Sequence, residues 1–199
     1  MQTNRAMIID VDYIRHNVRD IAANIDANRL RNFIREAENI DIRPAIGVAL
    51  WRKLSEYGPV QVDAQGSLLL DNNGVPILVN GNELTEEEGQ LLKGGYYTSE
   101  CGCEEYFEGL LLALGYFAYA RLIREQSLNV TAYGVVIKEG ELSSPADTKA
   151  IAAAALNAQN IAEAYLGNTL KYWRSILNKG CCGKPQVPKR MRKFVVIGK

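Results

Sequence analysis

The sequence predicts a mainly α-helical protein: an antiparallel helical bundle with a small β-hairpin insertion and an extended C-terminal arm. Three observations predict this class. Apolar residues recur at spacings of three and four along most of the chain, as on the buried face of a helix. One internal stretch is instead rich in β-favouring residues and Asn-Gly turns. The end of the chain is basic and contains prolines, which predicts an extended segment outside the core.

One domain, residues 1–178, is expected, followed by a separate arm, residues 179–199. The 199 residues are 47% apolar, which is enough to fill one core of ordinary size. The first residues lack a basic segment followed by an apolar one, so no signal peptide is expected. The most apolar stretch, Gly109 to Ala120, is too short to cross a bilayer, and no membrane partner is expected.

Three helices are expected in the first part of the domain. Asp12 to Ile25 and Asn28 to Ile40 each carry one apolar stripe. Asp41 is expected to be the N-cap of a third helix, with Pro44 in its first turn. The Tyr-Gly-Pro sequence at 57–59 ends that helix.

The β insertion is expected at about residues 58–84, where short β-favouring runs alternate with Asn-Gly turns. Thr85 then suits the N-cap of a short helix, because Glu88 stands at the capping-box spacing behind it. The pair Gly94-Gly95 is expected to end this helix.

The strongest helix signal covers Glu104 to Gln126, where apolar residues fall on nearly every face. This helix is expected to be central to the core, or shared between the core and a subunit interface. Asn129 to Ile137 is β-branched and predicted to be extended. The last helix is expected from Pro145 to about Asn178, a length of roughly 50 Å. A body of this size does not need that length, so the helix should break near Gly167 or project.

The inventory of catalytic groups is small, and no enzyme activity is expected. His16 is the only histidine, so Ser-His-Asp triads and common zinc-hydrolase sites cannot be assembled. Two carboxylate clusters, Glu86 to Glu88 and the set Glu104, Glu105 and Glu108, could hold magnesium in a nuclease. However, acids also favour the first turn of a helix, and both clusters are predicted at helix starts.

The four cysteines do not predict a cofactor or a metal. They form two close pairs, Cys101 with Cys103 and Cys181 with Cys182. Paired zinc ligands are usually separated by two or more residues, and these are not. Small, partly buried thiols are therefore the preferred interpretation.

Charge is divided between the body and the arm. Residues 179–199 hold seven Lys or Arg and no acid, which leaves 16 of the 23 basic residues and all 23 acidic ones in residues 1–178. The body is therefore at about −7 and the arm at about +7. Cations spaced by prolines and followed by a β-prone tetrad predict strand addition to another subunit's sheet, with the cations meeting carboxylates or phosphates. Folding of the arm onto its own body is the alternative. The residues expected to bind the partner are Lys184, Lys189, Arg190, Arg192, Lys193, Phe194, Val195, Val196 and Ile197.

Four stretches resemble a family of small virion proteins of tailed phages. ENIDIRPAIGVALWRKL (Glu38 to Leu54) is similar to the family's I-x-x-A-x-x-x-D-I-x-P-x-L-G helix pair. Glu83 to Tyr97 and Tyr106 to Ile123 resemble its next element and its central helix. VTAYGVVIKEGELSSPA (Val130 to Ala146) resembles the T-x-Y-G-V-V-x-K run before the last helix. Together they cover most of residues 28–178 and indicate a head–tail connector of phages of Bacteroidales hosts, crAss-like phages included.

The resemblance implies a virion structural protein, located at the virion neck and assembled in the host cytoplasm. Such connectors, or adaptors, form a ring, commonly of twelve copies, below the portal and extend the channel for DNA. The implied partners are further copies of the chain, the portal and other ring proteins, with genomic DNA passing through the lumen without sequence-specific binding. No catalytic, cofactor or metal residues carry over. Two alternatives remain from the residues alone: a nucleic-acid-binding accessory protein that uses the basic arm, and a magnesium-dependent nuclease that uses the glutamate clusters.

Overall fold

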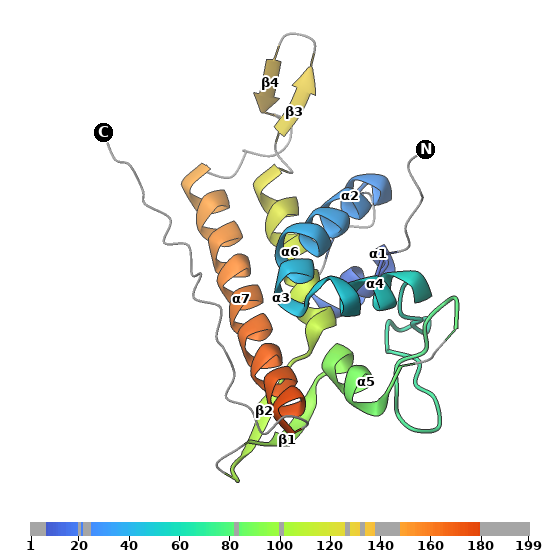
Figure 1. The fold of residues 1–199 in the computed structure, drawn as a ribbon. Helices are drawn as coiled ribbons and strands as arrows, with labels where there is room; N and C mark the ends of the chain where they lie inside the picture. The colour runs from blue at the N-terminus through green and yellow to red at the C-terminus, as the bar shows by residue number, and fades with distance from the viewer. Residues whose placement is uncertain are drawn as a thin grey trace.

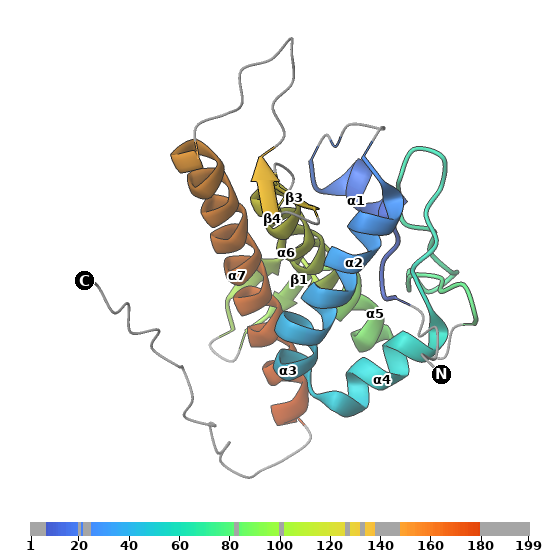
Figure 2. The same ribbon diagram turned by 90° about the horizontal axis from the view of Figure 1, so that it is seen from above.

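A computed structural model describes residues 7–19, 21, 25–81, 84–99, 102–125, 128–131, 134–137 and 148–179. Helix α6 (Leu110–Glu125) lies at the centre, with α2 (Ala27–Ala37) on one side and the long antiparallel helix α7 (Thr148–Lys179) on the other (Figures 1 and 2). The fold is therefore mainly α, as predicted. The other elements are α1 (Val11–Asn17), a π-helix (Glu38–Ile42), α3 (Arg43–Ile46), α4 (Val48–Tyr57), α5 (Glu86–Lys93), and strands β1 (Gly95–Thr98), β2 (Glu104–Phe107), β3 (Leu128–Thr131) and β4 (Gly134–Ile137).

Helix α6 is buried on nearly all sides, which confirms the prediction of a central core helix. At Gly115 it passes so close to α1 that a Cβ atom would lie 2.4 Å from Cγ2 of Val18. The predicted start at Glu104 is wrong, because residues 104–107 form strand β2. The helix begins only after Gly109, which has a φ of +89° and no room for a side chain, since a Cβ there would meet the Gly94 backbone at 2.4 Å.

Helix α7 is continuous and does not break at Gly167. Its buried residues follow one seam at spacings of three, four and seven, the pattern of a helix that packs along a partner helix. They are Ala155, Ala158, Ala162, Thr169 and Tyr172. Helix α7 packs mainly on α6, and around Tyr172 it also packs on β2 and α5. The length that the sequence left unexplained therefore covers the β1–β2 hairpin and α5 instead of standing free.

The N-terminal helices differ from the prediction at their ends. Helix α1 ends at Asn17, not at Ile25, and the Asn17 amide donates hydrogen bonds to the carbonyl oxygens of Tyr13 (3.1 Å) and Gly66 (2.7 Å). Asp41 is not an N-cap, because the chain stays helical from α2 through the π-helix into α3. The break comes instead at Gly47, whose φ of +87° suits only glycine.

The insertion between α4 and α5 is built from isolated antiparallel bridges and not from longer strands. They join Val60 to Leu78, Val62 to Leu68 and Leu70 to Pro76. Its two turns are closed by the same pattern of hydrogen bonds to an aspartate side chain. Asp63 Oδ1 accepts the amides of residues 65 and 67, and Asp71 Oδ1 accepts those of residues 73 and 75. The predicted β insertion is thus confirmed in kind and place, and α4 ends at Tyr57 as expected.

Helix α5 is capped as its sequence predicts. The Thr85 hydroxyl accepts the Glu88 amide at 3.2 Å, and the Glu88 carboxylate accepts the Thr85 amide at 2.9 Å. The helix ends at Lys93, before Gly94 with a φ of +83°. This reciprocal capping fixes the entry of the chain into the segment that leads to the β1–β2 hairpin.

Two antiparallel hairpins stand at opposite ends of the bundle (Figure 1). Strands β1 and β2 pair in the register Gly95 to Phe107, close to the second half of α7. Strands β3 and β4 follow α6 and confirm the prediction of an extended segment there. The predicted start of the last helix at Pro145 lies outside the described residues, as does the C-terminal arm after Lys179.

Candidate partner-binding surfaces

The predicted partner-binding residues of the arm, from Lys184 to Ile197, lie outside the described residues. The point from which the arm leaves the body is described, since α7 runs to Lys179. Seven residues before that point, Tyr172 packs on the β1–β2 hairpin. The hairpin is therefore the β structure closest along α7 to the start of the arm, and its faces and edges are candidate binding surfaces.

The inner face of the hairpin is anchored by aromatic packing on α7. Phe107 stacks on Tyr172 with ring centroids 4.4 Å apart and an interplanar angle of 14°. Tyr97 meets both rings edge-on, at 5.7 Å from Phe107 and 5.5 Å from Tyr172. The Tyr172 hydroxyl lies 3.2 Å from the Glu87 carbonyl oxygen and 3.1 Å from Gln90 Oε1, and can donate to either. Burial, with a smaller contribution from nearby carboxylates, raises the pKa of Tyr172 to about 12, so this hydroxyl remains a donor.

The outer face of the hairpin presents a pair of tyrosines to solvent. Tyr96 and Tyr106 are paired across the strands, with ring centroids 5.0 Å apart. Their exposed fractions are 65% and 55%. Tyrosine is enriched where proteins bind one another, because its ring supplies apolar area and its hydroxyl stays hydrogen-bonded. This pair, which we call the outer tyrosine pair, is a candidate contact surface.

The two edges of the hairpin are not equivalent. The Ser99 amide donates to the Cys103 carbonyl oxygen, which sets the alternation of bonded and non-bonded pairs along the strands. In that alternation the backbone groups of Tyr96, Glu104 and Tyr106 point outward. On β1, the Tyr96 carbonyl oxygen already accepts Gln90 Nε2 at 2.7 Å. On β2, no hydrogen bond within the described part of the chain occupies the outward groups of Glu104 and Tyr106.

The two glutamate clusters have different structural roles. Glu86 to Glu88 form the first turn of α5 as predicted, and Glu88 Oε2 lies 2.6 Å from Lys53 Nζ. Glu104 and Glu105 are on strand β2 and not at a helix start, which corrects the prediction, and Tyr97 donates its hydroxyl to Glu105 at 3.0 Å. Within the described ranges, no three His, Cys, Asp or Glu side chains are grouped so that they could hold a metal ion.

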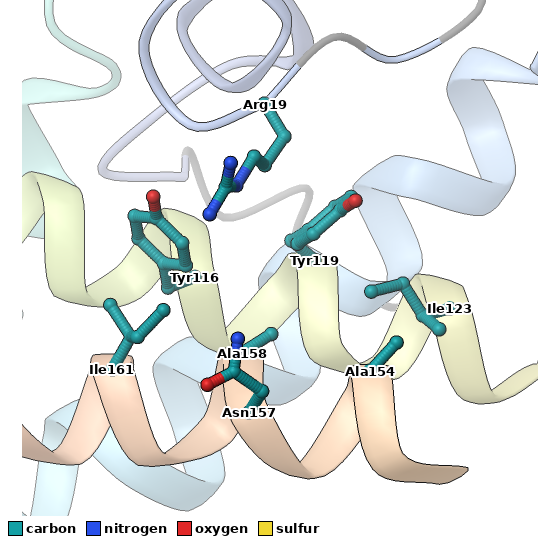
Figure 3. Close-up of a pocket in the computed structure, with 8 residues that line it drawn as sticks. All are labelled: Arg19, Tyr116, Tyr119, Ile123, Ala154, Asn157, Ala158 and Ile161. Atoms are coloured by element: carbon teal, nitrogen blue, oxygen red, sulfur yellow. The ribbon is translucent and has the colours of Figure 1, made fainter. Parts of the chain in front are cut away.

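A pocket of about 220 Å³ lies between α6 and α7 (Figure 3). In Figure 3 the guanidinium of Arg19 reaches toward Tyr116 on the side away from α7. The pocket contains no carboxylate, histidine or cysteine, so it lacks the common acid–base and nucleophilic groups. Its lining residues are Arg19, Tyr116, Tyr119, Ile123, Ala154, Asn157, Ala158 and Ile161.

Two buried or partly buried carboxyl groups lie in the π-helix, and the sequence did not single out either as such. Glu38 is 3% exposed, and its Oε1 accepts the Ile8 amide at 2.6 Å. Burial raises the pKa of Glu38 to about 7, although the Ile8 amide and Arg35 oppose this. Asp41 forms an ion pair with Arg121 of α6 at 2.7 Å, and burial nevertheless raises its pKa. Both groups join the π-helix to other elements, which indicates a structural role.

His16 and Cys103 are both exposed side chains. His16 is exposed on α1, and its Nδ1 lies 2.8 Å from the Asp12 carbonyl oxygen of the preceding turn. Cys103, the residue before β2, is exposed, which corrects the expectation of a partly buried thiol at this position. The other cysteines, Cys101, Cys181 and Cys182, lie outside the described residues. In the part that the structure describes, neither His16 nor Cys103 belongs to a group of three His, Cys, Asp or Glu side chains that could hold a metal ion.

The fold and these surfaces define a helical protein whose notable features are contact surfaces. A model described as a family of unknown function (DUF6712) matches residues 76–177, just over half of the chain, and the chain belongs to that family. The match spans the second part of the insertion and all elements from α5 to near the end of α7. Neither the curated proteins nor the solved structures include a match. No helix among the described residues is both long and apolar enough to span a membrane.

Proposed function

We propose that the chain is a subunit of the head–tail connector of a tailed phage, a structural protein that forms a ring under the portal and continues the DNA channel. The observation that carries the proposal is the resemblance of four sequence stretches to such connectors. These stretches fall on successive elements of the fold: the π-helix to α4, α5 to β1, β2 to α6, and β3 onward. The resemblance therefore follows the fold through most of the body.

Exposed apolar side chains on separate elements support an assembling subunit. Besides the outer tyrosine pair, large apolar residues are exposed on α7, on the insertion and around the π-helix and α4. A head-to-tail ring needs two different surfaces on each subunit, one for each neighbour. A single exposed apolar residue is ordinary on a protein surface. Several of them on separate elements are consistent with more than one surface that a neighbouring subunit covers. The residues are Ile40, Val48, Leu69, Leu70, Val79, Leu156 and Leu177.

The charge of the body supports a channel role. Residues 1–178 carry a net charge of about −7, and a lumen lined with carboxylates would repel the phosphate backbone and let DNA slide. The same charge disfavours a body that grips nucleic acid. The proposal assigns no enzyme activity and no cofactor to the ring subunit.

Sedimentation tests the proposal directly. The full chain, alone or mixed with purified portal protein of the same phage, is expected to sediment as a large oligomer or as part of a portal complex. A chain that stays monomeric at all concentrations and does not bind the portal would refute the connector role. Deleting residues 179–199 should abolish docking on the portal or the neighbouring ring, while circular dichroism shows that the helical body is retained.

The second candidate is a nucleic-acid-binding accessory protein, favoured by the seven cations of the arm. Contacts with phosphate release counterions, so DNA affinity would fall steeply with salt concentration. Titration of labelled duplex DNA at several salt concentrations distinguishes the candidates. Tight, steeply salt-dependent binding by the full chain, lost on deletion of residues 179–199, would favour this second function over the connector.

A further inference from the structure

We propose that the open edge of strand β2 binds residues 189–197 of a neighbouring copy as a third strand of the β1–β2 hairpin. This inference rests on the proposed ring, because the ring supplies the neighbouring copy. Beyond the ring itself, it names the two segments that form one contact between neighbouring copies: the edge of strand β2 and a segment of the arm. Four features carry it, namely the edge, its charge, its exposed rings and the length of the linker.

The edge of β2 offers the backbone groups that an added strand requires. The outward amide and carbonyl groups of Glu104 and Tyr106 are two residues apart, which is the spacing of the bonds between paired strands. The opposite edge, on β1, is already occupied at Tyr96 by Gln90 Nε2. Both Glu104 and Tyr106 are exposed. Over the ranges that the structure describes, no hydrogen bond occupies the outward groups of Thr98 on β1 either. The bond to Tyr96 nevertheless partly blocks the β1 edge, so the β2 edge is the more open of the two to an added strand.

The charge along this edge is complementary to the arm. Residues 102–108 contain three glutamates and no cation. The arm carries Lys189, Arg190, Arg192 and Lys193 immediately before its β-prone residues. Each exposed ion pair contributes little binding energy by itself. Several positive charges that face several negative charges nevertheless orient the binding partner and disfavour incorrect partners.

The apolar part of the arm matches the outer tyrosine pair. In an added strand, alternate side chains of Phe194 to Ile197 would continue the row formed by Tyr96 and Tyr106 on the outer face. Aromatic and β-branched residues pair well across strands, and each such pair contributes several tenths of a kcal/mol. The contact would cover the two most exposed rings of the hairpin.

The length of the linker permits the arm to reach a neighbouring copy. Residues 180–188 contain Pro185 and Pro188, which favour an extended backbone of about 28 Å for nine residues at 3.1 Å each. The β2 strand of the same copy lies beside Tyr172, and Tyr172 is about 10 Å along α7 from the start of the arm. A linker that can span nearly three times that distance is long enough to pass beyond its own hairpin and reach that of a neighbouring copy.

Disulfide trapping in the full chain tests the contact, since Cys103, the residue before β2, is exposed. In a background with Cys101, Cys181 and Cys182 changed to Ser, single cysteines are introduced as Met191→Cys, Phe194→Cys or Val196→Cys. Mild oxidation is expected to give a ladder of chains linked through Cys103 in at least one variant, identified by peptide mapping. The matched control adds Cys103→Ser to each variant and is expected to lose this ladder.

A charge exchange tests the specificity of the contact. Arg190→Glu with Arg192→Glu alters no residue of the described body and should lower the yield of the Cys103 link about tenfold. Adding Glu104→Lys, at the exposed position of β2, should restore part of the yield. An unchanged yield in the arm variant, or no recovery in the combined variant with circular dichroism unchanged, would contradict the pairing.

The outcomes separate this inference from the proposed function. A link within one chain, seen as an oxidised monomer, would show that the arm folds onto its own body and would overturn the inference. Large oligomers or portal complexes without any Cys103 link would leave the connector role intact and also overturn the inference. A strict monomer that ignores the portal would remove the proposed function itself.

Discussion

The core around α6 and the cluster of Leu91, Phe107 and Tyr172 are built in different ways. The first is a large set of mostly aliphatic side chains from α1, α2, the π-helix, α4, α6 and α7. The second contains three buried residues, one each from α5, β2 and α7. Many contacts hold each helix of the large core, whereas the hairpin depends on a few aromatic contacts. Regions with few buried apolar contacts open most easily, and binding surfaces are often found in them.

The largest expected effect is in the large core. Leu114→Ala removes a side chain that is fully buried on α6, and should lower the free energy of unfolding by roughly 2–5 kcal/mol, because a cavity remains. Urea denaturation followed by circular dichroism measures this. Leu156→Ala, on the exposed face of α7, is the matched control, with an expected change below about 0.5 kcal/mol. Equal effects would mean that the packing described for α6 is wrong.

The next largest effect concerns Glu38, a buried carboxyl group beside the large core. Burial raises the pKa of Glu38 to about 7, so between its unfolded value near 4.5 and pH 7 the folded protein binds the proton and the unfolded chain does not. Stability from this group is therefore present at low pH and falls as pH rises through this window, by up to roughly 3 kcal/mol.

Glu38→Gln keeps an oxygen that can accept the Ile8 amide and removes the titration. Its free energy of unfolding should change less between pH 5 and pH 8 than that of the unmodified chain, and should be the higher of the two at pH 8. Urea titrations at several pH values measure this. Glu56→Gln, at an exposed position on α4, serves as the control and should leave the slope as it is. If the stability of Glu38→Gln depends on pH as strongly as that of the unmodified chain, another titrating group causes the pH dependence.

A smaller effect would sharpen the contrast between the two regions. Tyr172→Phe keeps the stacked ring but removes the hydroxyl near the Glu87 and Gln90 oxygens, at a cost of about 1 kcal/mol. Hydrogen exchange should quicken in the β1–β2 hairpin and the second half of α7, while amides of α6 keep their protection. Tyr96→Phe, on the exposed side of the same hairpin, is the control. Faster exchange throughout α6 would show that the two regions unfold together.

The smallest effect concerns the start of α5. Thr85→Ala removes the cap of the Glu88 amide, and should cost roughly 0.5–1 kcal/mol. Exchange of the first amides of α5 should quicken, with smaller effects elsewhere. Thr98→Ala, on an exposed position of β1, removes the same hydroxyl without a cap. Similar changes in both variants would argue that the capping box adds nothing to the stability of this region.

Local patterns predicted much of the fold. The capping box of α5, the end of α4 at Tyr57 and the central position of α6 each depend on a few neighbouring residues or on one strong apolar pattern. The errors occurred where a distant partner decides the outcome. Glu104 to Phe107 read as helix because apolar residues follow them, but they pair with β1 as a strand. Asp41 read as an N-cap, but it meets Arg121 on α6 inside a continuous helical stretch.

For the candidate binding surface, too, some features could be predicted from the sequence and others required the tertiary structure. The charge and β-preference of the arm are properties of consecutive residues, so the sequence alone predicts a basic, strand-forming segment there, and this stays a prediction. That β2 has one open edge, that Tyr96 and Tyr106 point outward, and that Glu38 is buried against Ile8 required the tertiary structure. Composition and periodicity describe how a segment folds by itself. Register, burial and the pKa of a carboxyl group depend on which distant segment lies beside it, because packing and desolvation arise only when those segments meet.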